Sequence, residues 1–382
     1  MEPELLFEII KRGEDSKHQF KKNVNNAESL AADMVAFSNG SGGIMLVGIS
    51  DDGSVTGLTS DDVRRLNQLI SNAASQHVHP SINPISENSI IDGNLVLTID
   101  IPPGINKPYQ DKNGVFWVKS GADKRRATSR EEIQRMFQRA SLLHADEMPV
   151  SGMTIEDFDM RYFCNYFQKR YGMLPENEKQ PYPRLLENMG LMQGDTLTLC
   201  GALLFAKEPC YKIPAYIVKA GAFDANDLTT NNYRDSRNIE GKLESVYSQT
   251  VSFIVSNLHH LQGTQDFNSV GIPEIPHIAI AELVANSLIH RDYFVSASVR
   301  AFVFRNRVEI TSPGHLPNNL TVEKILLGVS NTRNQLLASH ANHLIPYRGY
   351  GSGILKAIEA YPDIEFIDDR DGNQFKAILK RR

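Results

Sequence analysis

The sequence predicts an α+β protein with an N-terminal α+β domain followed by a C-terminal α/β sandwich. Its first part alternates helical periodicity with short buried strands bounded by turn residues. Its last part is ordered as helix, two strands, glycine-rich loop, helix and strand, a sequence of elements typical of an α/β sandwich. A length of 382 residues with 41% hydrophobic residues is enough for two or three domains with ordinary cores. We place their boundaries at 1–145, 146–270 and 271–382.

The N-terminal domain opens with an amphipathic helical pattern, and a second helix is predicted over residues 27–37. The turn in "NGSGG" then leads into a buried strand at 44–49, and Asp52-Gly53 marks a hairpin. Another strand is predicted within residues 94–103, where it ends at two prolines. These elements together predict a mixed α+β domain.

The stretch "GVFWVKSGADKRRAT" predicts a strand followed by a basic loop. The next residues, "SREEIQRMF", place Ser129 three residues before Glu132, which predicts a helix that begins with a capping box. The charges of the loop would then project from a fixed scaffold.

The connecting region 146–270 contains two strong helical patterns. One lies within "TIEDFDMRYFCNYFQKRYG" and ends at Gly172, and the other lies within 243–258. Between them runs a set of apolar segments with a strand bounded by proline. This region carries no recognisable chemistry.

Composition excludes several classes of protein. The net charge of −5 does not indicate a strongly basic nucleic-acid binder, so any basic surface must be local. Three separate cysteines without a CxxC pair argue against a disulfide framework or a zinc site and favour a reducing compartment. No apolar stretch is long enough to span a membrane, and the charged N-terminus is unlike a signal peptide. We expect a cytoplasmic protein.

The segment "AELVANSLIHRDYF" places polar residues at helical spacing within an apolar helix. Glu282, Asn286 and His290 are four residues apart, so they share one face. An amide oxygen suits Mg²⁺, and a nearby carboxylate can act as a base toward water. The alternative is an ordinary solvent-facing polar stripe on an amphipathic helix.

The segment "RGYGSGI" supplies glycines directly before a second helical pattern. Such glycines let the backbone approach phosphates closely, while the helix N–H groups point at the anion. The alternative is a glycine-rich turn without a ligand. The glycines are Gly349, Gly351 and Gly353.

The order of these motifs resembles the GHKL-type ATP-binding fold, and more closely the C-terminal domain of bacterial RecG-like transcriptional regulators. The resemblance covers about residues 276–370 and rests on "AELVANSLIHRDY", "VEITSPGHLP", "SNTRNQLLA" and "RGYGSGI". It implies ATP or ADP with Mg²⁺ as cofactors, water activation by Glu282 and a metal ligand in Asn286. The implied cofactor-binding residues are Asn286, His290, Gly314, Gly349, Gly351 and Gly353.

Two positions depart from the family pattern. Ser312-Pro313-Gly314 stands where the fold normally has the Asp that reads the adenine amino group, and Ala281 stands where the RecG-like proteins often have Arg. The chain also lacks a GxxxxGK[ST] P-loop, so the resemblance implies no helicase motor.

The N-terminal part resembles the Schlafen AlbA-type domain over about residues 12–138. The resemblance rests on "GEDSKHQFKK", "FSNGSGG", "VGISDDG" and "KSGADKRRAT" in this order. It implies nucleic-acid binding, mainly to DNA. Residues 1–145 hold 16 Lys and Arg against 18 Asp and Glu, so contacts to phosphates would come from local clusters. The candidates are Lys17, Lys21, Lys22, Lys119, Lys124, Arg125 and Arg126.

In animal Schlafens a related domain cuts RNA with three carboxylates. Here Glu14 matches the first of these, Gln19 stands in place of the second, and Asp51 or Asp52 matches the third. A catalytic cation needs several anionic ligands, so Gln19 argues against nuclease activity. The sequence therefore predicts a nucleotide-sensitive DNA-binding transcriptional regulator, in homodimeric or higher form. The alternatives are a nuclease gated by nucleotide and a binding module without a functional ATP site.

Overall fold

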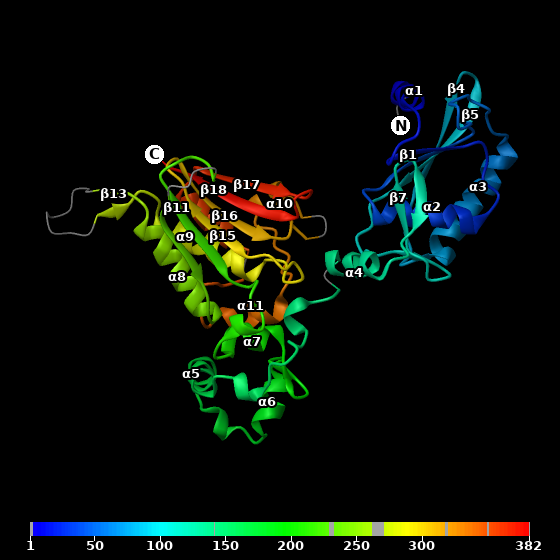
Figure 1. Ribbon diagram of the computed structural model, residues 1–382. Coiled ribbons are helices and arrows are strands. Elements are labelled where there is room, and N and C mark those ends of the chain that lie inside the picture. Colours follow the sequence, from blue (N-terminus) through cyan, green and yellow to red (C-terminus); the bar gives the residue numbers. More distant parts are fainter. Residues whose placement is uncertain are drawn as a thin grey trace. The chain divides into compact units, whose positions relative to one another are not determined.

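The computed structural model describes residues 3–140, 142–228, 233–261, 271–317, 320–349 and 351–381. The chain divides into two compact units, Met1–Leu143 and His144–Arg382 (Figure 1). Each unit has its own hydrophobic core, and each is described separately below. In the described residues no helix is long and apolar enough to cross a membrane.

The N-terminal unit is built on a four-stranded sheet in the order β1-β2-β5-β4. Strands β1 and β2 are parallel, whereas β2, β5 and β4 are antiparallel neighbours. Helix α2 contributes Leu30, Met34 and Phe37 to the core of this unit, and its cap Asn26 accepts hydrogen bonds from the backbone N–H groups of Glu28 and Ser29. The elements are α1 (Pro3–Arg12), β1 (His18–Lys21), α2 (Ala27–Asn39), β2 (Gly43–Val47), α3 (Ser60–Asn72), β3 (Val78–His79), β4 (Ile85–Ile91), β5 (Asn94–Ile101) and β6 (Gln110–Asp111).

The basic segment after this sheet differs from the expected loop. It forms a β-hairpin of β7 (Trp117–Ser120) and β8 (Asp123–Arg126), followed by α4 (Arg130–Arg139). Ser129 caps α4 by accepting from the Glu132 backbone N–H at 3.0 Å. The predicted capping box is not completed, because the Glu132 carboxylate binds the Arg125 guanidinium instead.

The C-terminal unit begins with a small helical lobe around a cluster of aromatic side chains. Phe158, Phe163, Tyr166 and Phe205 pack edge-on or tilted against one another. Helix α5 ends at Gly172 in the left-handed conformation, with φ of 74°, as the sequence predicts. The lobe comprises α5 (Met160–Tyr171), α6 (Tyr182–Asn188), β9 (Met192–Gln193), β10 (Thr196–Leu197), α7 (Leu199–Phe205) and the later α11 (Gln335–Ala341).

The remainder of this unit is a six-stranded sheet in the order β12-β11-β15-β16-β18-β17, with helices on one face. Only β11 and β15 are parallel. Two of its strands come from residues 146–270, the region expected only to connect the domains. The elements are β11 (Val218–Phe223), β12 (Tyr233–Ile239), α8 (Leu243–Ser256), β13 (His260–Leu261), β14 (Ile272–Pro273), α9 (His277–Ile289), β15 (Val299–Val303), β16 (Arg307–Pro313), α10 (Val322–Leu326), α12 (Gly353–Ala360), β17 (Ile364–Asp369) and β18 (Gln374–Lys380).

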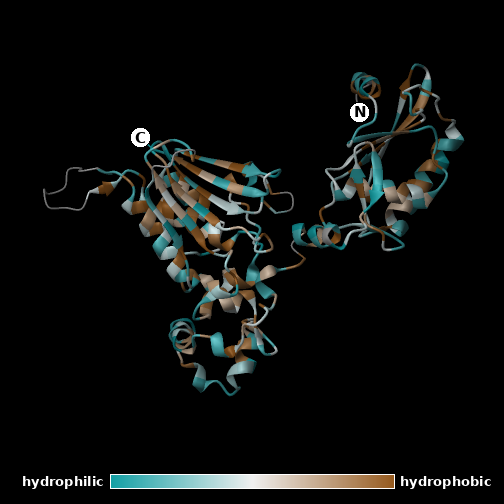
Figure 2. Ribbon diagram, in the orientation of Figure 1, coloured by the Kyte–Doolittle hydropathy of each residue, from teal (hydrophilic) through white to brown (hydrophobic). Residues whose placement is uncertain are grey.

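The strands of this sheet alternate in polarity, which is visible as alternating colour in Figure 2. Residues such as Ala301 and Val303 of β15 point to the helices and are fully buried, whereas Arg300 and Phe302 point to the other face. Among the described elements, α8, α9 and α12 cover one face of the sheet, and no helix covers the other face.

Candidate functional site

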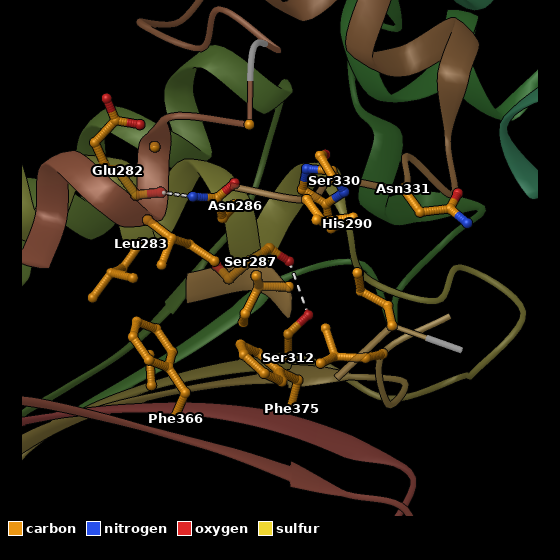
Figure 3. Close-up of a pocket in the computed structure, with 18 of the residues that line it drawn as sticks. Glu282, Leu283, Asn286, Ser287, His290, Ser312, Ser330, Asn331, Phe366 and Phe375 are labelled. Atoms are coloured by element: carbon orange, nitrogen blue, oxygen red, sulfur yellow. Dashed lines mark hydrogen bonds between the residues drawn. The ribbon is translucent and has the colours of Figure 1, made fainter. Parts of the chain in front are cut away.

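Helix α9 carries the three polar residues that the sequence placed on one face. Nine of its thirteen residues are buried, so it packs on nearly all sides between the sheet and α8. Glu282, Asn286 and His290 lie on the side that lines a pocket, rather than on a solvated stripe (Figure 3). These residues therefore do not form the solvent-facing polar stripe that was the alternative for this helix.

The pocket has about 1060 Å³ of empty space, part of it open to solvent. Its walls come from α9, the end of β16, the loops at 314–317 and 329–331, and the glycine-rich segment before α12. All seven predicted residues line it: Glu282, Asn286, His290, Gly314, Gly349, Gly351 and Gly353.

Asn286 and Glu282 are linked through the helix backbone. The Asn286 Nδ2 atom donates to the Glu282 carbonyl oxygen at 2.8 Å, which leaves the Asn286 Oδ1 atom as the free acceptor. The side chain of Glu282 is 14% exposed, and its Oε1 atom lies 3.7 Å from Lys356 Nζ on α12. Helix α9 thus offers two oxygen donors beside one ammonium group.

The glycine-rich segment passes close to these donors. A Cβ atom on Gly353 would lie 2.7 Å from Glu282 Oε2 and 3.1 Å from Asn286 Nδ2. Gly351 has φ of 71°, and a Cβ there would lie 2.5 Å from the Gly328 carbonyl oxygen. Gly351 therefore requires glycine for steric reasons as well as for its backbone conformation, whereas a side chain at position 353 would have to displace the Glu282 carboxylate.

Helix α12 starts at this point with uncapped N–H groups. The cap residue Ser352 makes no side-chain hydrogen bond to the first turn. Orphan N–H groups and the positive end of the helix dipole both favour an anion. Arg348 and Lys356 add positive charge, and Glu282 is the one acidic residue in the lining within the described residues.

His290 lies at the inner wall, where its Nε2 atom is 2.9 Å from the Tyr347 hydroxyl. Burial lowers the pKa of His290 to about 4, and the nearby Arg333 acts in the same direction. The ring is therefore neutral at pH 7, and it shapes the pocket without supplying a cation to a phosphate.

The floor of the pocket is apolar. The phenyl rings of Phe366 and Phe375 are stacked, with centroids 6.0 Å apart, and lie below Leu283 (Figure 3). Ser312 is also here, but its hydroxyl donates to the Ser287 carbonyl oxygen at 3.0 Å. This floor suits a flat aromatic ring, and no carboxylate is present among its described residues to read an exocyclic amino group.

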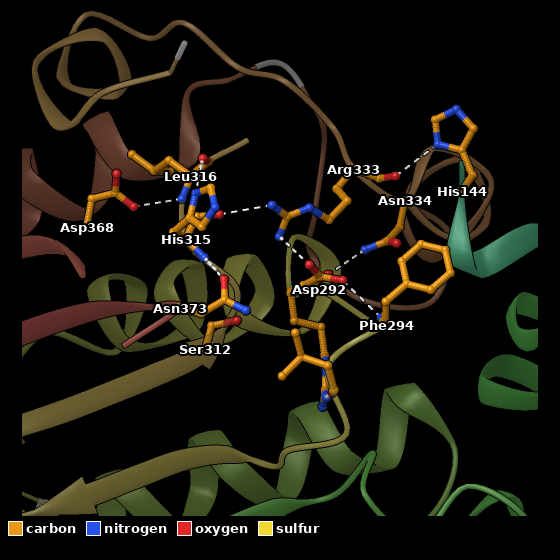
Figure 4. A network of polar contacts seen from close by, with 12 residues as sticks. His144, Asp292, Phe294, Ser312, His315, Leu316, Arg333, Asn334, Asp368 and Asn373 are labelled. Atoms are coloured by element: carbon orange, nitrogen blue, oxygen red, sulfur yellow. Dashed lines mark hydrogen bonds and ion pairs between the residues drawn. The ribbon is translucent and has the colours of Figure 1, made fainter. Parts of the chain in front are cut away.

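A network of polar contacts holds the loop at 313–317 beside the pocket (Figure 4). Buried Arg333 donates to the His315 carbonyl oxygen at 2.9 Å and lies 4.0 Å from the Asp292 carboxylate. The Leu316 N–H donates to Asp368 Oδ1 at 2.7 Å from the other side. Position 314 needs glycine, because its φ is 93° and a Cβ atom there would clash with Asp292 and Arg333.

Arg291, from the same "HRDY" cluster, is structural. It is 2% exposed, and its guanidinium lies over the rings of Tyr216 and Tyr293, 4.9 and 4.8 Å from their centroids. It donates to the carbonyl oxygens of Val295 and Ala297. These contacts fix the turn after α9 and leave Arg291 away from the pocket lining.

Several pocket residues were missed by sequence reasoning. Lys356 follows Gly353 by three residues, so its helical spacing could have placed it over Glu282. Phe366 and Phe375 sit on strands that looked like plain core, and no local pattern shows that their shared face opens on a pocket. The loop residues Ser330 and Asn331 line it as well.

The residues present fit a magnesium nucleotide. The donor set is one amide oxygen and one carboxylate, which are hard oxygen ligands of the kind Mg²⁺ prefers. The backbone cradle at Gly351 and Gly353 leaves room that a side chain would fill. Asn286 would hold the cation, the N–H groups of α12 and Lys356 the phosphates, and the apolar floor the base.

In the N-terminal unit the predicted basic residues are largely engaged in internal contacts. Lys124 Nζ lies 2.9 Å from the Asp33 carboxylate, which is buried on α2, and it also donates to the Ser29 carbonyl oxygen. Arg125 forms a two-pronged pair with Glu132. Two of the expected phosphate contacts are therefore neutralised within the fold.

Other basic side chains remain more open. Arg126 is exposed and stacks over the Trp117 ring at 5.2 Å. Lys17 and Lys22 are exposed, and Lys21 is half-buried. Lys119 lies over the Phe37 ring and donates to the Ala122 carbonyl oxygen. Burial lowers the pKa of Lys119, and Lys21 adds to the effect, so the two predicted basic clusters are within electrostatic reach of each other.

The nuclease-like positions do not form a metal site. Glu14 accepts from the Phe20 N–H at 2.6 Å, and buried Gln19 donates to Asp33 at 3.3 Å. Asp51 and Asp52 lie in an exposed turn, where Asp52 accepts from Ser54. Within the part of the chain that the structure describes, no three His, Cys, Asp or Glu residues could hold one metal ion.

Comparisons with known families agree with this division. Residues 14–128 match the family model described as "Schlafen, AlbA_2". Residues 296–379 match the model described as "Putative ATP-dependent DNA helicase recG C-terminal". The chain therefore pairs an AlbA_2-like domain with a RecG-like C-terminal domain.

Solved structures with similarity include the DIP2311 protein from Corynebacterium diphtheriae. It is 20% identical, with 98% of this chain and 79% of that chain covered and a TM-score of 0.47. Another is the N-terminal domain of a RecG-related protein from Nitrosomonas europaea, described as a putative ATP-dependent DNA helicase. It is 23% identical, with 34% of this chain and 94% of that chain covered and a TM-score of 0.24. No curated protein sequence matches the chain.

The two family matches cover all the candidate residues of the N-terminal unit but only part of the pocket in the C-terminal unit. The AlbA_2-like range contains every candidate of the N-terminal unit, from Glu14 to Arg126. The RecG-like range contains the glycine segment, but it begins at residue 296, after α9. Glu282, Asn286 and His290 therefore rest on the geometry of the pocket rather than on the match.

Proposed function

We propose that the RecG-like unit binds a purine nucleotide with Mg²⁺ and that the AlbA_2-like unit binds DNA, which makes the protein a nucleotide-sensitive transcriptional regulator. One observation supports this most strongly. Seven residues predicted from three separate motifs line a single pocket. A set of unrelated polar positions would have no reason to converge in this way.

In this proposal each side of the pocket has a separate task. Asn286 holds the cation through Oδ1, because its Nδ2 atom is already committed to the helix backbone. The N–H groups at the start of α12 receive the phosphates, and the stacked phenyl rings receive the base. The magnesium ion, when bound, neutralises phosphate charge and orients the phosphate oxygens.

Glu282 is the candidate for water activation. Its carboxylate is paired with Lys356 at 3.7 Å, close enough to compete for the same ammonium group as a phosphate. When Lys356 turns to an incoming phosphate, Glu282 loses its counter-charge and becomes a better acceptor for a proton from water. This gives the site a route to slow hydrolysis and assigns Lys356 the role of sensing the phosphate.

DNA binding in the other unit rests on the basic residues that the fold leaves accessible, Lys17, Lys22 and Arg126. So few contacts give weak and salt-dependent binding to a monomer. A symmetric dimer would present two such patches to one DNA, and its twofold axis would favour a palindromic site. We therefore propose a homodimer as the DNA-binding form.

The nuclease alternative has less support. Gln19 and Asp33 are bound to each other, and Lys124 already occupies the cation position beside Asp33. An ammonium group at this place would oppose a divalent metal ion. The further alternative, a module without a functional nucleotide site, is favoured only by Ser312 at the base-reading position.

The proposal is tested by measuring binding of duplex DNA to the full-length protein with and without magnesium ATP, by fluorescence anisotropy. A regulator predicts a change in DNA affinity of about fivefold or more, which is the usual range of coupling between sites. Identical affinity in both conditions would remove the regulatory link, and metal-dependent cleavage of an RNA or DNA probe that is abolished by Glu14→Ala would favour the nuclease.

A further inference from the structure

The face of the six-stranded sheet opposite α8, α9 and α12 carries an unusual set of side chains. Four strands place residues side by side in one row, because Lys219 of β11 pairs with Arg300 of β15, Arg300 with Thr311 of β16, and Thr311 with Lys376 of β18. Neighbouring strands lie about 4.8 Å apart. Three cationic side chains therefore cross the sheet within a short distance.

This row borders a hollow at one end of the same face. The hollow is lined by Lys219, Arg300 and Thr311 together with the loop after α9 and the turn between β17 and β18. The loop contributes Ser296 and Ser298, so hydroxyl groups lie next to the cations. No Asp or Glu belongs to the lining in the described part of the chain. A cationic, hydroxyl-rich hollow of this kind is complementary to phosphate.

The charge of the row is only partly balanced within the protein. Arg300 donates to the neutral amide of Gln374 at 2.6 Å, so its charge is not neutralised. Lys219 is exposed. Lys376 lies 4.0 Å from Asp369, at the outer edge of an ion pair. Further along the face, Glu309 is paired with Arg307 at 2.6 Å, and the exposed Glu365 of β17 lies beyond it in the neighbouring row.

Aromatic rings lie directly beside the cationic row. Phe302, half-buried, pairs across the sheet with Gly221, and Phe223 lies 5.6 Å from it, ring centre to ring centre. A Cβ atom on Gly221 would lie 2.8 Å from the Phe223 ring and 3.3 Å from the Phe302 ring. Gly221 thus lets both rings rest against the sheet backbone.

We infer that this face is a second nucleic-acid surface, and that it binds a single strand. Phosphates would lie along Lys219, Arg300 and Lys376, with bases over the neighbouring rings. Cations that follow a backbone beside aromatic side chains are the combination that proteins use for single strands. A duplex keeps its bases stacked inside and cannot lay them over the rings, so we expect a duplex to bind through the N-terminal unit and not through this face. The inference is independent of the nucleotide pocket, which lies on the other face of the sheet.

The test uses the full-length protein and a labelled 15-nucleotide single strand of thymidines, with anisotropy measured over a range of salt concentrations. Lys219→Ala combined with Arg300→Ala should weaken binding about tenfold and reduce the log–log salt slope by about 1.4, at roughly 0.7 per phosphate of a single strand. Phe302→Leu should weaken it about fivefold without changing the slope, because it removes stacking and no charge.

Lys169→Ala combined with Lys179→Ala is the matched control. It removes the same charge from exposed positions of the helical lobe, and it should leave single-strand binding nearly unchanged. A matched duplex should bind the Lys219 and Arg300 variant as well as it binds the unaltered protein. If the variant binds the single strand with unaltered affinity and slope, or if it loses duplex binding equally, the inference is overturned. It is also overturned if Phe302→Leu has no effect.

Discussion

Gly353 lies so close to Glu282 that a Cβ atom on the glycine would be 2.7 Å from the glutamate Oε2 atom. Residues 71 positions apart in the sequence thus form one wall of the pocket. The contact joins the glycine-rich segment to the polar face of α9. It explains why both motifs are needed to define the site, although each alone has an ordinary structural explanation.

The first prediction follows from this contact. Gly353→Ala should force the Glu282 carboxylate to move, with a loss of less than about 1 kcal/mol in stability because the contacted atom is the flexible end of a side chain. It should also weaken magnesium nucleotide binding at least about tenfold, since the phosphate cradle is displaced. Calorimetry and thermal unfolding would measure the two effects. Glu359→Ala, at an exposed position on the same helix, serves as the control and should change neither quantity appreciably.

Lys124 should stabilise the fold more than it binds DNA. Lys124→Ala leaves the Asp33 carboxylate, 4% exposed, without its cation, and we expect a loss of about 2–4 kcal/mol in the free energy of unfolding. Adding Asp33→Asn should recover part of the loss, because the buried charge is removed. Urea denaturation followed through Trp117, the one tryptophan of the chain, reports on this unit. Additive effects in the double variant would show that the two residues do not interact.

Arg126 is the clearest candidate for a DNA contact in the hairpin. Arg126→Ala should lower the log–log salt slope of duplex binding by about 0.9, the value for one phosphate. Because the guanidinium stacks over Trp117 at 5.2 Å, DNA binding should also change the tryptophan fluorescence of the unaltered protein. Arg125→Ala is the matched control. Its effect on the salt slope should be small, since the Arg125 guanidinium is already paired with Glu132. An equal slope in the Arg126 variant and the unaltered protein would exclude the contact.

His340 predicts how the C-terminal unit responds to acid. Its Nδ1 atom accepts from the Arg170 guanidinium at 2.8 Å, and its Nε2 atom donates to the Met189 carbonyl oxygen at 3.0 Å. Burial, with the Arg170 charge, lowers the pKa of His340 to about 4 from its usual 6.5. The unfolded chain therefore binds more protons between these values, so stability falls as the pH falls from about 6.5 to 4.

The loss from this histidine should reach up to about 3 kcal/mol near pH 4. His340→Gln should be less stable at pH 7 but should show a flatter dependence of stability on pH, measured by urea denaturation with far-UV circular dichroism. Exposed His79→Gln should leave the dependence unchanged. The pH profile of the His340 variant would match that of the unaltered protein if the ring were already protonated in the fold.

Much of the architecture follows from local patterns in the sequence. The predicted helix at 27–37 is α2, the strand at 44–49 is β2, and Gly172 ends α5 as expected. Periodicity and capping residues determine these elements because their signals are local. The basic hairpin of β7 and β8 was expected to be a loop, since strand pairing depends on contacts that periodicity does not reveal.

The candidate sites could be predicted less completely. Glu282, Asn286 and the glycines could be named because helical spacing and turn chemistry restrict them. Asp33 could not, because an acid in the middle of an apolar helix gives no sign that Lys124, 91 residues later, is its partner. Ion pairs of this kind depend on tertiary distances that the sequence does not show. A lysine expected at the surface, such as Lys124, can therefore belong to an internal ion pair.

The most direct test of the central claim is calorimetry of ATP with the full-length protein, with and without Mg²⁺, compared with Asn286→Ala. We predict that Mg²⁺ strengthens ATP binding to the unaltered protein, and that Asn286→Ala loses this gain because the cation loses its amide oxygen. The Mg²⁺-independent part of the affinity should remain, since the N–H groups of α12 and Lys356 are intact. No binding of ATP or ADP at millimolar concentration, or an unchanged effect of Mg²⁺ in the variant, would contradict the assignment of the pocket.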